Sequence, residues 1–162
     1  MELMLDNSKI LWHQERVKNW VEGKRIYPIT IDMALTQACG YNCIFCYSKN
    51  FQTNERHRIT WEIAKNFIDD CAEMDVKAIS LVSDGESTLN PIWTDFVVYA
   101  KKLGIDVAVG SCGYFMDKKD LEKVLPKLTY FRFNISAGTP ERYGFIHGVP
   151  NDYFNKVCQN NH

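Results

Sequence analysis

Three cysteines, Cys39, Cys43 and Cys46, lie within eight residues in the spacing Cys-x3-Cys-x2-Cys. Thiolates bind soft metals and iron–sulfur clusters, and three on one short segment can reach a single small metal centre. Structural zinc is almost always four-coordinate, so three cysteines alone do not complete such a site. A [4Fe–4S] cube held by three cysteines would instead keep one iron open for a cofactor or substrate.

The surroundings of this segment narrow its interpretation. It follows a strand-like run over residues 29–35, and its spacing differs from the Cys-x2-Cys-x2-Cys and Cys-x4-Cys-x2-Cys runs of ferredoxins. Two alternatives stay open on the residues alone. One is a zinc ion that takes a distant fourth ligand such as His57, and the other is chance spacing.

Residues 38–47 resemble the cluster-binding segment of the radical SAM superfamily, which binds a [4Fe–4S] cluster through Cys-x3-Cys-x-aromatic-Cys; Phe45 fills the aromatic position. The resemblance implies that Cys39, Cys43 and Cys46 are the metal ligands. It also implies that S-adenosylmethionine (SAM) binds the open iron. A reductant such as a ferredoxin or flavodoxin would drive its cleavage to methionine and a 5′-deoxyadenosyl radical. That radical would abstract hydrogen from a substrate that the sequence does not identify.

Two later stretches resemble the family's cofactor site. Asp84, Gly85 and Glu86 resemble its Gly-Gly-Glu stretch, whose backbone and acid meet the amino group of SAM, although Asp84 replaces the first glycine. The resemblance also implies that Asn134 and Ser136, on the polar face of a predicted strand, meet the cofactor's ribose or carboxylate. The structural alternatives are a simple Asp-Gly turn and polar side chains that only line a cavity.

Five further residues are candidates for the site, and each also has a purely structural interpretation. By the same resemblance, Phe45 and Tyr47 place a ring against adenine, or they shield the cluster from water. Cys112 either faces the reaction space or packs as a small hydrophobe. Arg142 either pairs with the cofactor carboxylate or lies on a solvated helix surface. His147, within Ile-His-Gly-Val-Pro, is interpreted as a loop residue and only weakly as a substrate contact.

Strands alternate with helices along the chain, which predicts βαβ units and a parallel sheet. Helix starts are marked by the capping residues Thr60 and Asp117 and by Thr139 before a proline. An N-terminal helix should pack on the domain through Ile10, His13, Val17, Trp20 and Val21. Strands are predicted over residues 29–35, 78–82, 105–109 and 130–136, and helices over 8–22, 61–74, about 91–103, from 117 and from 139.

The predicted strands alternate between apolar and polar or small residues. In the third, Ile105, Val107 and Val109 oppose Asp106 and Ala108. One face can lie under helices while the other lines a wetter interior, whereas strands buried on both faces read as continuous apolar runs. With the resemblance, this favours an α/β partial parallel (β/α) barrel with about four βα units present out of six. An open sheet with one solvated face is the alternative.

Composition limits the class of protein, its partners and its location. The 162 residues are 46% hydrophobic with a net charge of −1, which is typical of a globular domain and gives no electrostatic signal for nucleic acid or membrane. No secretory signal is apparent, and the three cysteines outside the cluster segment, Cys71, Cys112 and Cys158, are scattered along the chain. A reducing cytoplasm is therefore the predicted location.

We predict an N-terminal helical extension over residues 1–27 and a radical SAM core domain over 28–162 that is truncated at its C-terminus. The edge of the fourth strand would then be covered by a missing segment or another chain. Alternative functions are an iron–sulfur electron carrier or sensor, a zinc-stabilised interaction module, and an inactive truncated remnant.

Overall fold

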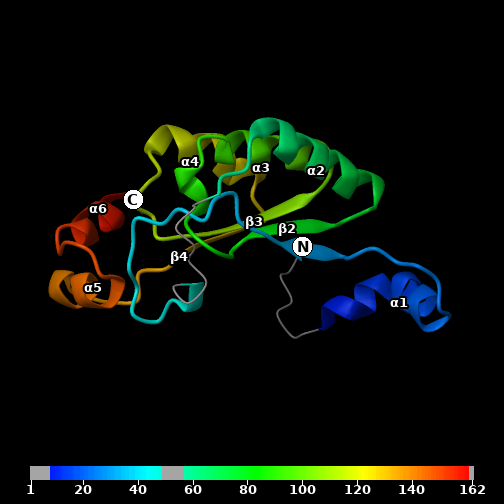
Figure 1. Ribbon diagram of the computed structural model, residues 1–162, viewed down its shortest axis with the longest axis horizontal. Coiled ribbons are helices and arrows are strands. Elements are labelled where there is room, and N and C mark those ends of the chain that lie inside the picture. Colours follow the sequence, from blue (N-terminus) through cyan, green and yellow to red (C-terminus); the bar gives the residue numbers. More distant parts are fainter. Residues whose placement is uncertain (1–7, 49–56, 161–162) are drawn as a thin grey trace.

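The computed structural model describes residues 8–48 and 57–160. Four parallel strands pair in the order β1-β2-β3-β4, with Ile79 opposite Val107 in the β2–β3 register (Figure 1). The predicted α/β partial barrel with four βα units is therefore confirmed. The strands are β1 (Thr30–Asp32), β2 (Ala78–Leu81), β3 (Asp106–Ser111) and β4 (Tyr130–Phe133).

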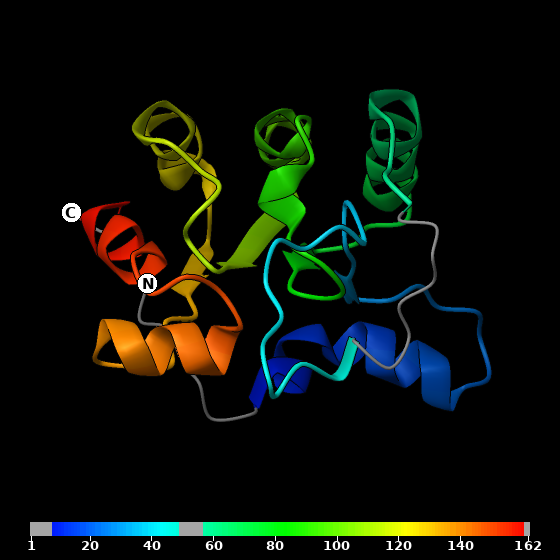
Figure 2. The same ribbon diagram turned by 60° about the vertical axis from the view of Figure 1, so that its left-hand side comes forward.

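Three helices lie in a row on one face of this sheet, and α1 and α5 lie on its opposite side (Figure 2). The row is α2 (Trp61–Glu73), α3 (Trp93–Lys102) and α4 (Lys118–Val124). The predicted caps are confirmed, because side chains of Thr60, Asp117 and Thr139 accept hydrogen bonds from the first turns of α2, α4 and α5. The remaining helical segments are η1 (Ser8–His13), α1 (Gln14–Val21), η3 (Ser87–Leu89), η4 (Leu125–Lys127), α5 (Pro140–His147) and α6 (Tyr153–Asn160).

The main core lies between the sheet and this row of helices. Ile79 on β2 and Val107 on β3 are fully buried against Phe96 of α3. Ala108 and Gly110, which point to the other face, are only half-buried. The predicted alternation therefore separates a packed outer face from a more open inner face. None of the described helices is long and apolar enough to cross a membrane.

The strands β1 and β4 are much shorter than predicted, and in each case a specific contact explains the break. After β1, the backbone N–H of Leu35 donates to Ser87 Oγ (3.3 Å), and Thr36 forms an isolated bridge with Arg58. After β4, Asn134 makes a last ladder hydrogen bond, from its N–H to the Ser111 carbonyl (2.9 Å). Ser136 then adopts a left-handed φ of 53°, which a strand does not accommodate.

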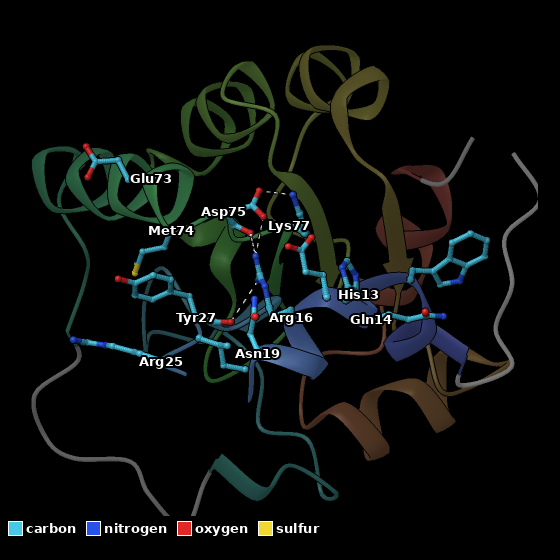
Figure 3. Close-up of a pocket in the computed structure, with 13 residues that line it drawn as sticks. His13, Gln14, Arg16, Asn19, Arg25, Tyr27, Glu73, Met74, Asp75 and Lys77 are labelled. Carbon is cyan, nitrogen blue, oxygen red and sulfur yellow. Dashed lines mark hydrogen bonds and ion pairs between the residues drawn. The ribbon is translucent and has the colours of Figure 1, made fainter. Parts of the chain in front are cut away.

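The N-terminal helix does not dock as predicted. Trp20 and Val21 of the expected apolar stripe are 66% and 75% exposed, and Val17 is only half-buried. The chain is held instead by Arg16, which donates to the Pro28 carbonyl (3.0 Å) and to the carbonyl and carboxylate of Asp75 (2.9 and 2.8 Å). These contacts lie beside a cavity of about 470 Å³ under the start of the sheet (Figure 3). Helical periodicity alone could not reveal this polar attachment.

We expect Arg16→Met to lower the free energy of unfolding by about 1–3 kcal/mol, because backbone carbonyls of Pro28 and Asp75 lose a charged donor. Urea unfolding measures this loss, and hydrogen exchange should locate it in α1. Arg25→Met is the matched control, since Arg25 lines the same cavity but its guanidinium only lies 5.9 Å from the Tyr27 ring centroid. Equal effects of the two substitutions would contradict this role of Arg16.

Candidate functional site

Four chain segments meet at the carboxyl ends of the strands, where ligands bind in parallel α/β folds. They are the cysteine loop (residues 36–48) after β1 and the segments that follow β2, β3 and β4. Together with Arg132 of β4 and His147 of α5 they enclose a cavity of about 160 Å³. Its lining residues are Cys39, Tyr41, Cys43, Phe45, Cys46, Leu81, Val82, Ser83, Gly85, Glu86, Gly110, Ser111, Cys112, Arg132, Asn134 and His147.

This cavity brings together most of the residues singled out from the sequence. All three cysteines of the motif line it, as do Phe45, Gly85, Glu86 and Asn134. Asp84 and Ser136 do not line it. Asp84 borders a separate cavity of about 210 Å³ with Thr36 and His57, and Ser136 Oγ donates to Asn134 Oδ1 (3.3 Å). Ser136 therefore lies behind Asn134 rather than at the cavity wall.

The described residues also bear on the zinc alternative. All six cysteines lie within the described ranges, and none forms a disulfide. Across residues 8–48 and 57–160, no three His, Cys, Asp or Glu side chains are grouped to hold a single metal ion. His57 lines the cavity of Asp84 and not that of the cysteines. The three cysteines of the motif therefore share a cavity that His57 does not line.

Gly85 joins the β2 end to the cysteine loop through backbone contact. Its φ is +67°, and a Cβ at this position would lie 2.3 Å from the Thr36 carbonyl oxygen and 2.8 Å from that of Ala38. The next residue, Glu86, donates its backbone N–H to the Ala38 carbonyl (2.9 Å). Both the left-handed conformation and the lack of a side chain are therefore required here.

The Glu86 carboxylate holds the ends of β2 and β3 together. It is 5% exposed; Oε1 accepts from Thr88 Oγ1 (2.7 Å) and Ser111 Oγ (2.9 Å), and Oε2 accepts from the Cys112 backbone N–H (2.8 Å). Burial, followed by the charge of Glu86, raises the pKa of the Cys112 thiol above its ordinary value. Cys112 therefore stands at the cavity wall as a protonated thiol.

His147 corrects the sequence interpretation. It is the last residue of α5 rather than a loop residue, and it is 1% exposed. The Ile-His-Gly-Val-Pro composition suggested a loop, but Gly148 is the left-handed residue that ends the helix (φ +62°). The His147 ring contacts Cys43 Sγ through Nδ1 (3.1 Å) and the Ile135 carbonyl through Nε2 (2.7 Å). Burial lowers the pKa of His147.

Sequence reasoning missed Arg132 as a site residue. It lies on β4 two residues before Asn134, and both line the cavity. The alternation of polar and apolar residues in the fourth strand could have identified it, because Arg132 lies on the same polar face as Asn134. Arg142, the arginine that was considered instead, is exposed on α5 with its guanidinium 5.5 Å from the Phe145 ring centroid. Tyr47 is 63% exposed and does not line the cavity.

We expect Gly85→Ala to destabilise the chain by at least about 2 kcal/mol more than Gly104→Ala. Both glycines have positive φ (67° and 82°), so each substitution costs about 1–2 kcal/mol because alanine is strained in the left-handed conformation. Only Gly85 faces backbone atoms of the cysteine loop, whereas nothing lies within 4 Å of a Cβ at Gly104. Equal unfolding free energies, measured in urea, would show that the cysteine loop does not depend on Gly85.

Known proteins resemble this chain over most of its length. It is 28% identical over 125 residues to a probable GTP 3′,8-cyclase of Thermococcus kodakarensis, covering 75% of this chain and 40% of that protein. It is 25% identical over 124 residues to the AdoMet-dependent heme synthase of Methanosarcina barkeri, covering 76% and 35%. The chain thus spans two fifths or less of the length of these curated relatives.

Solved structures share the fold. Streptococcus suis SuiB bound to S-adenosylmethionine superposes with a TM-score of 0.67 at 15% identity, covering 98% of this chain and 39% of SuiB. BtrN in complex with AdoMet and 2-DOIA superposes with a TM-score of 0.61 at 16% identity, covering 80% and 55%. Residues 33–160 match the sequence model of the Radical SAM superfamily, a span that includes the cysteine loop and every residue that lines its cavity. The chain belongs to the radical SAM superfamily.

Proposed function

We propose that this chain carries the cluster and cofactor site of a radical SAM enzyme, with Cys39, Cys43 and Cys46 as ligands of a [4Fe–4S] cluster. The observation that carries the proposal is that all three thiols line one cavity at the strand ends, together with Gly85 and Asn134. Once bound, the reduced cluster and SAM would supply a one-electron cleavage that yields a hydrogen-abstracting 5′-deoxyadenosyl group.

The cysteine donors fit such a cluster in kind and in placement. Thiolate sulfur is the preferred ligand of iron–sulfur clusters, and each thiolate of a cube binds a different iron. The three side chains therefore need to face one cavity rather than meet at one ion, and all three line the same cavity. Cys46 Sγ lies 3.0 Å from Ser48 Oγ, so a hydroxyl donor is available to a thiolate at this position.

Chain residues around the cavity can bind the polar ends of SAM. Glu86 Oε1 is occupied by Thr88 and Ser111, but Oε2 has a lone pair left beside its bond from the Cys112 N–H, and this oxygen can accept from an amino group. Arg132 can donate to the carboxylate, and Asn134 can bond either the carboxylate or the ribose hydroxyls. Phe45, which is 54% exposed, can cover the adenine.

The hydrogen bonds of the Glu86 carboxylate fix part of the site before any ligand binds. Its carboxylate is held by hydrogen bonds from Thr88 and from Ser111 and Cys112 at the end of β3, so the oxygen offered to the amine needs no reorganisation. The rings of Tyr41 and Phe115, whose centroids lie 6.0 Å apart, pack in the same apolar cluster as Cys39 and Cys43 and can limit the access of water from that side. The reductant is proposed to be a separate low-potential protein such as a ferredoxin or flavodoxin.

We expect the whole chain, reconstituted anaerobically with iron and sulfide, to bind close to four irons and four sulfides, the stoichiometry of a cube, and to convert SAM to 5′-deoxyadenosine after reduction. Single replacement of Cys39, Cys43 or Cys46 by Ala should abolish cluster absorbance and cleavage. Cys158→Ala is the matched control, because Cys158 is a half-buried cysteine that does not line the cavity.

The alternatives give different results in the same assay. Iron and sulfide without cleavage of SAM would indicate an electron carrier or sensor. Zinc in place of iron would indicate an interaction module, and the absence of any metal would indicate an inactive remnant. Each of these outcomes contradicts the proposed function.

We expect Arg132→Gln to weaken SAM binding to the reconstituted protein by about 10- to 100-fold, the cost of losing a charge-assisted hydrogen bond. Cluster content should not change, because Arg132 supplies no thiolate. Arg142→Gln is the matched control on exposed α5 and should bind SAM normally. An equilibrium binding measurement with SAM distinguishes the two variants. Weaker binding by Arg142→Gln alone would instead place the carboxylate contact on α5.

A further inference from the structure

His147 is a buried side chain whose two ring nitrogens both have partners. Nε2 lies 2.7 Å from the Ile135 carbonyl oxygen, and Nδ1 lies 3.1 Å from Cys43 Sγ. A carbonyl can only accept a hydrogen bond, so Nε2 carries the hydrogen, an assignment that rests on this bond. Nδ1 of this tautomer is an acceptor, so the Cys43 thiol donates to it. The ring therefore connects the exit of β4 to the sulfur of Cys43, across 104 residues of chain.

Aromatic neighbours fix the plane of this ring. Tyr143 lies one helical turn earlier with its ring centroid 4.3 Å away, and Tyr41 and Phe45 approach it edge-on at 5.6 and 5.8 Å. With two polar contacts and three ring contacts, the imidazole has no room to change rotamer without breaking several of them. The direction of the Nδ1 contact is thus set by the fold and not by Cys43.

The backbone of the same helical turn holds Cys43 from both sides. The N–H groups of Asn42 and Ile44 donate to the carbonyls of His147 and Ile146, each at 2.9 Å. The last carbonyls of a helix lack partners within it, so the cysteine loop satisfies two of them. Gly148 makes this approach possible, because a Cβ there would lie 2.6 Å from the Asn42 carbonyl oxygen.

We propose that the end of α5, Ile146 and His147 with the C-cap residue Gly148, is a positioning element for the cluster ligand Cys43. Once Cys43 has lost its thiol hydrogen to become a ligand, its sulfur lies packed against the fixed ring of His147. This inference rests on the proposed function, since it takes Cys43 to be a ligand. Partners that orient a ligand and shield it from water control both metal retention and reduction potential. His147 therefore acts through Cys43 and is not itself a catalytic residue.

Two amide substitutions separate the two contacts of the ring. The terminal amide of Gln reaches the position of Nε2, and the amide of Asn reaches that of Nδ1. His147→Gln thus keeps a donor for Ile135 and loses the contact with Cys43, whereas His147→Asn keeps a side-chain group in contact with Cys43. In the reconstituted whole chain, we expect His147→Gln to release iron to a chelator about tenfold faster and to shift the midpoint potential of the cluster. His147→Asn should stay close to wild type in both measurements.

Tyr143→Phe provides the control for stability. It removes another buried hydrogen bond from α5, between the Tyr143 and Tyr41 hydroxyls (3.0 Å), without touching the contact between His147 and Cys43. The positioning role is refuted if His147→Gln matches wild type, or if Tyr143→Phe changes iron release and potential by the same amounts. Wild-type protein that takes up no iron refutes the proposed function as well, so the two failures are distinguishable.

A measurement on the wild-type chain does not depend on variants that fold. The imidazole ¹⁵N signals of His147 should shift and broaden when the cluster is reduced, since the ring contacts a ligand sulfur. His13, which lines the cavity beside Arg16 under the start of the sheet, serves as the internal reference and should be unaffected. Unchanged His147 signals in a loaded, reduced protein would overturn the inference.

Discussion

The site depends on one backbone contact, in which the turn at Gly85 lies directly against the start of the cysteine loop. Parallel strands bring their carboxyl ends to one edge of the sheet, but this alone does not fix the loops that follow them. Gly85 and the bond from the Glu86 N–H to the Ala38 carbonyl fix the first loop to the second. The Glu86 carboxylate then fixes the second to the third through Ser111 and Cys112. The cysteines are consequently tied to three strands at once.

The fourth βα unit completes this arrangement from the other side of the chain. Cys43 is held by the end of α5 through two backbone bonds and the His147 ring, all more than 100 residues away in sequence. Such non-local contacts form only when the intervening strands have folded. Closing a loop of this length costs conformational entropy, which each contact must offset before it adds to stability. The proposed ligand geometry is therefore a property of the folded domain and not of the short cysteine motif, even though the motif contains every thiolate.

Sequence reasoning succeeded where the signal is local. Strand alternation, the caps at Thr60 and Asp117 and the cysteine spacing each report a period or a hydrogen bond within a few residues. It failed where a distant partner decides. The strand before the cysteines ends early because the Leu35 backbone N–H donates to the Ser87 hydroxyl instead of continuing the ladder. The N-terminal helix is held by hydrogen bonds of Arg16, which helical periodicity does not encode. His147 was assigned to a loop because a helix-ending glycine and a loop glycine look alike in one sequence.

The molecule uses different forces for its scaffold and for its site. Between the sheet and α2–α4, side chains such as Ile68 and Phe96 are fully buried, and apolar burial of this kind supplies most of the stability. In the cysteine loop, Ile44, Phe45 and Tyr47 are 61%, 54% and 63% exposed, so burial of these side chains does not order it. Backbone hydrogen bonds, the close approach of two glycines and the buried ring of Tyr41 order it instead. Position in this loop is thus set by directional contacts, which tolerate less displacement than apolar packing, and a site proposed to hold three sulfurs around one cluster benefits from that stiffness.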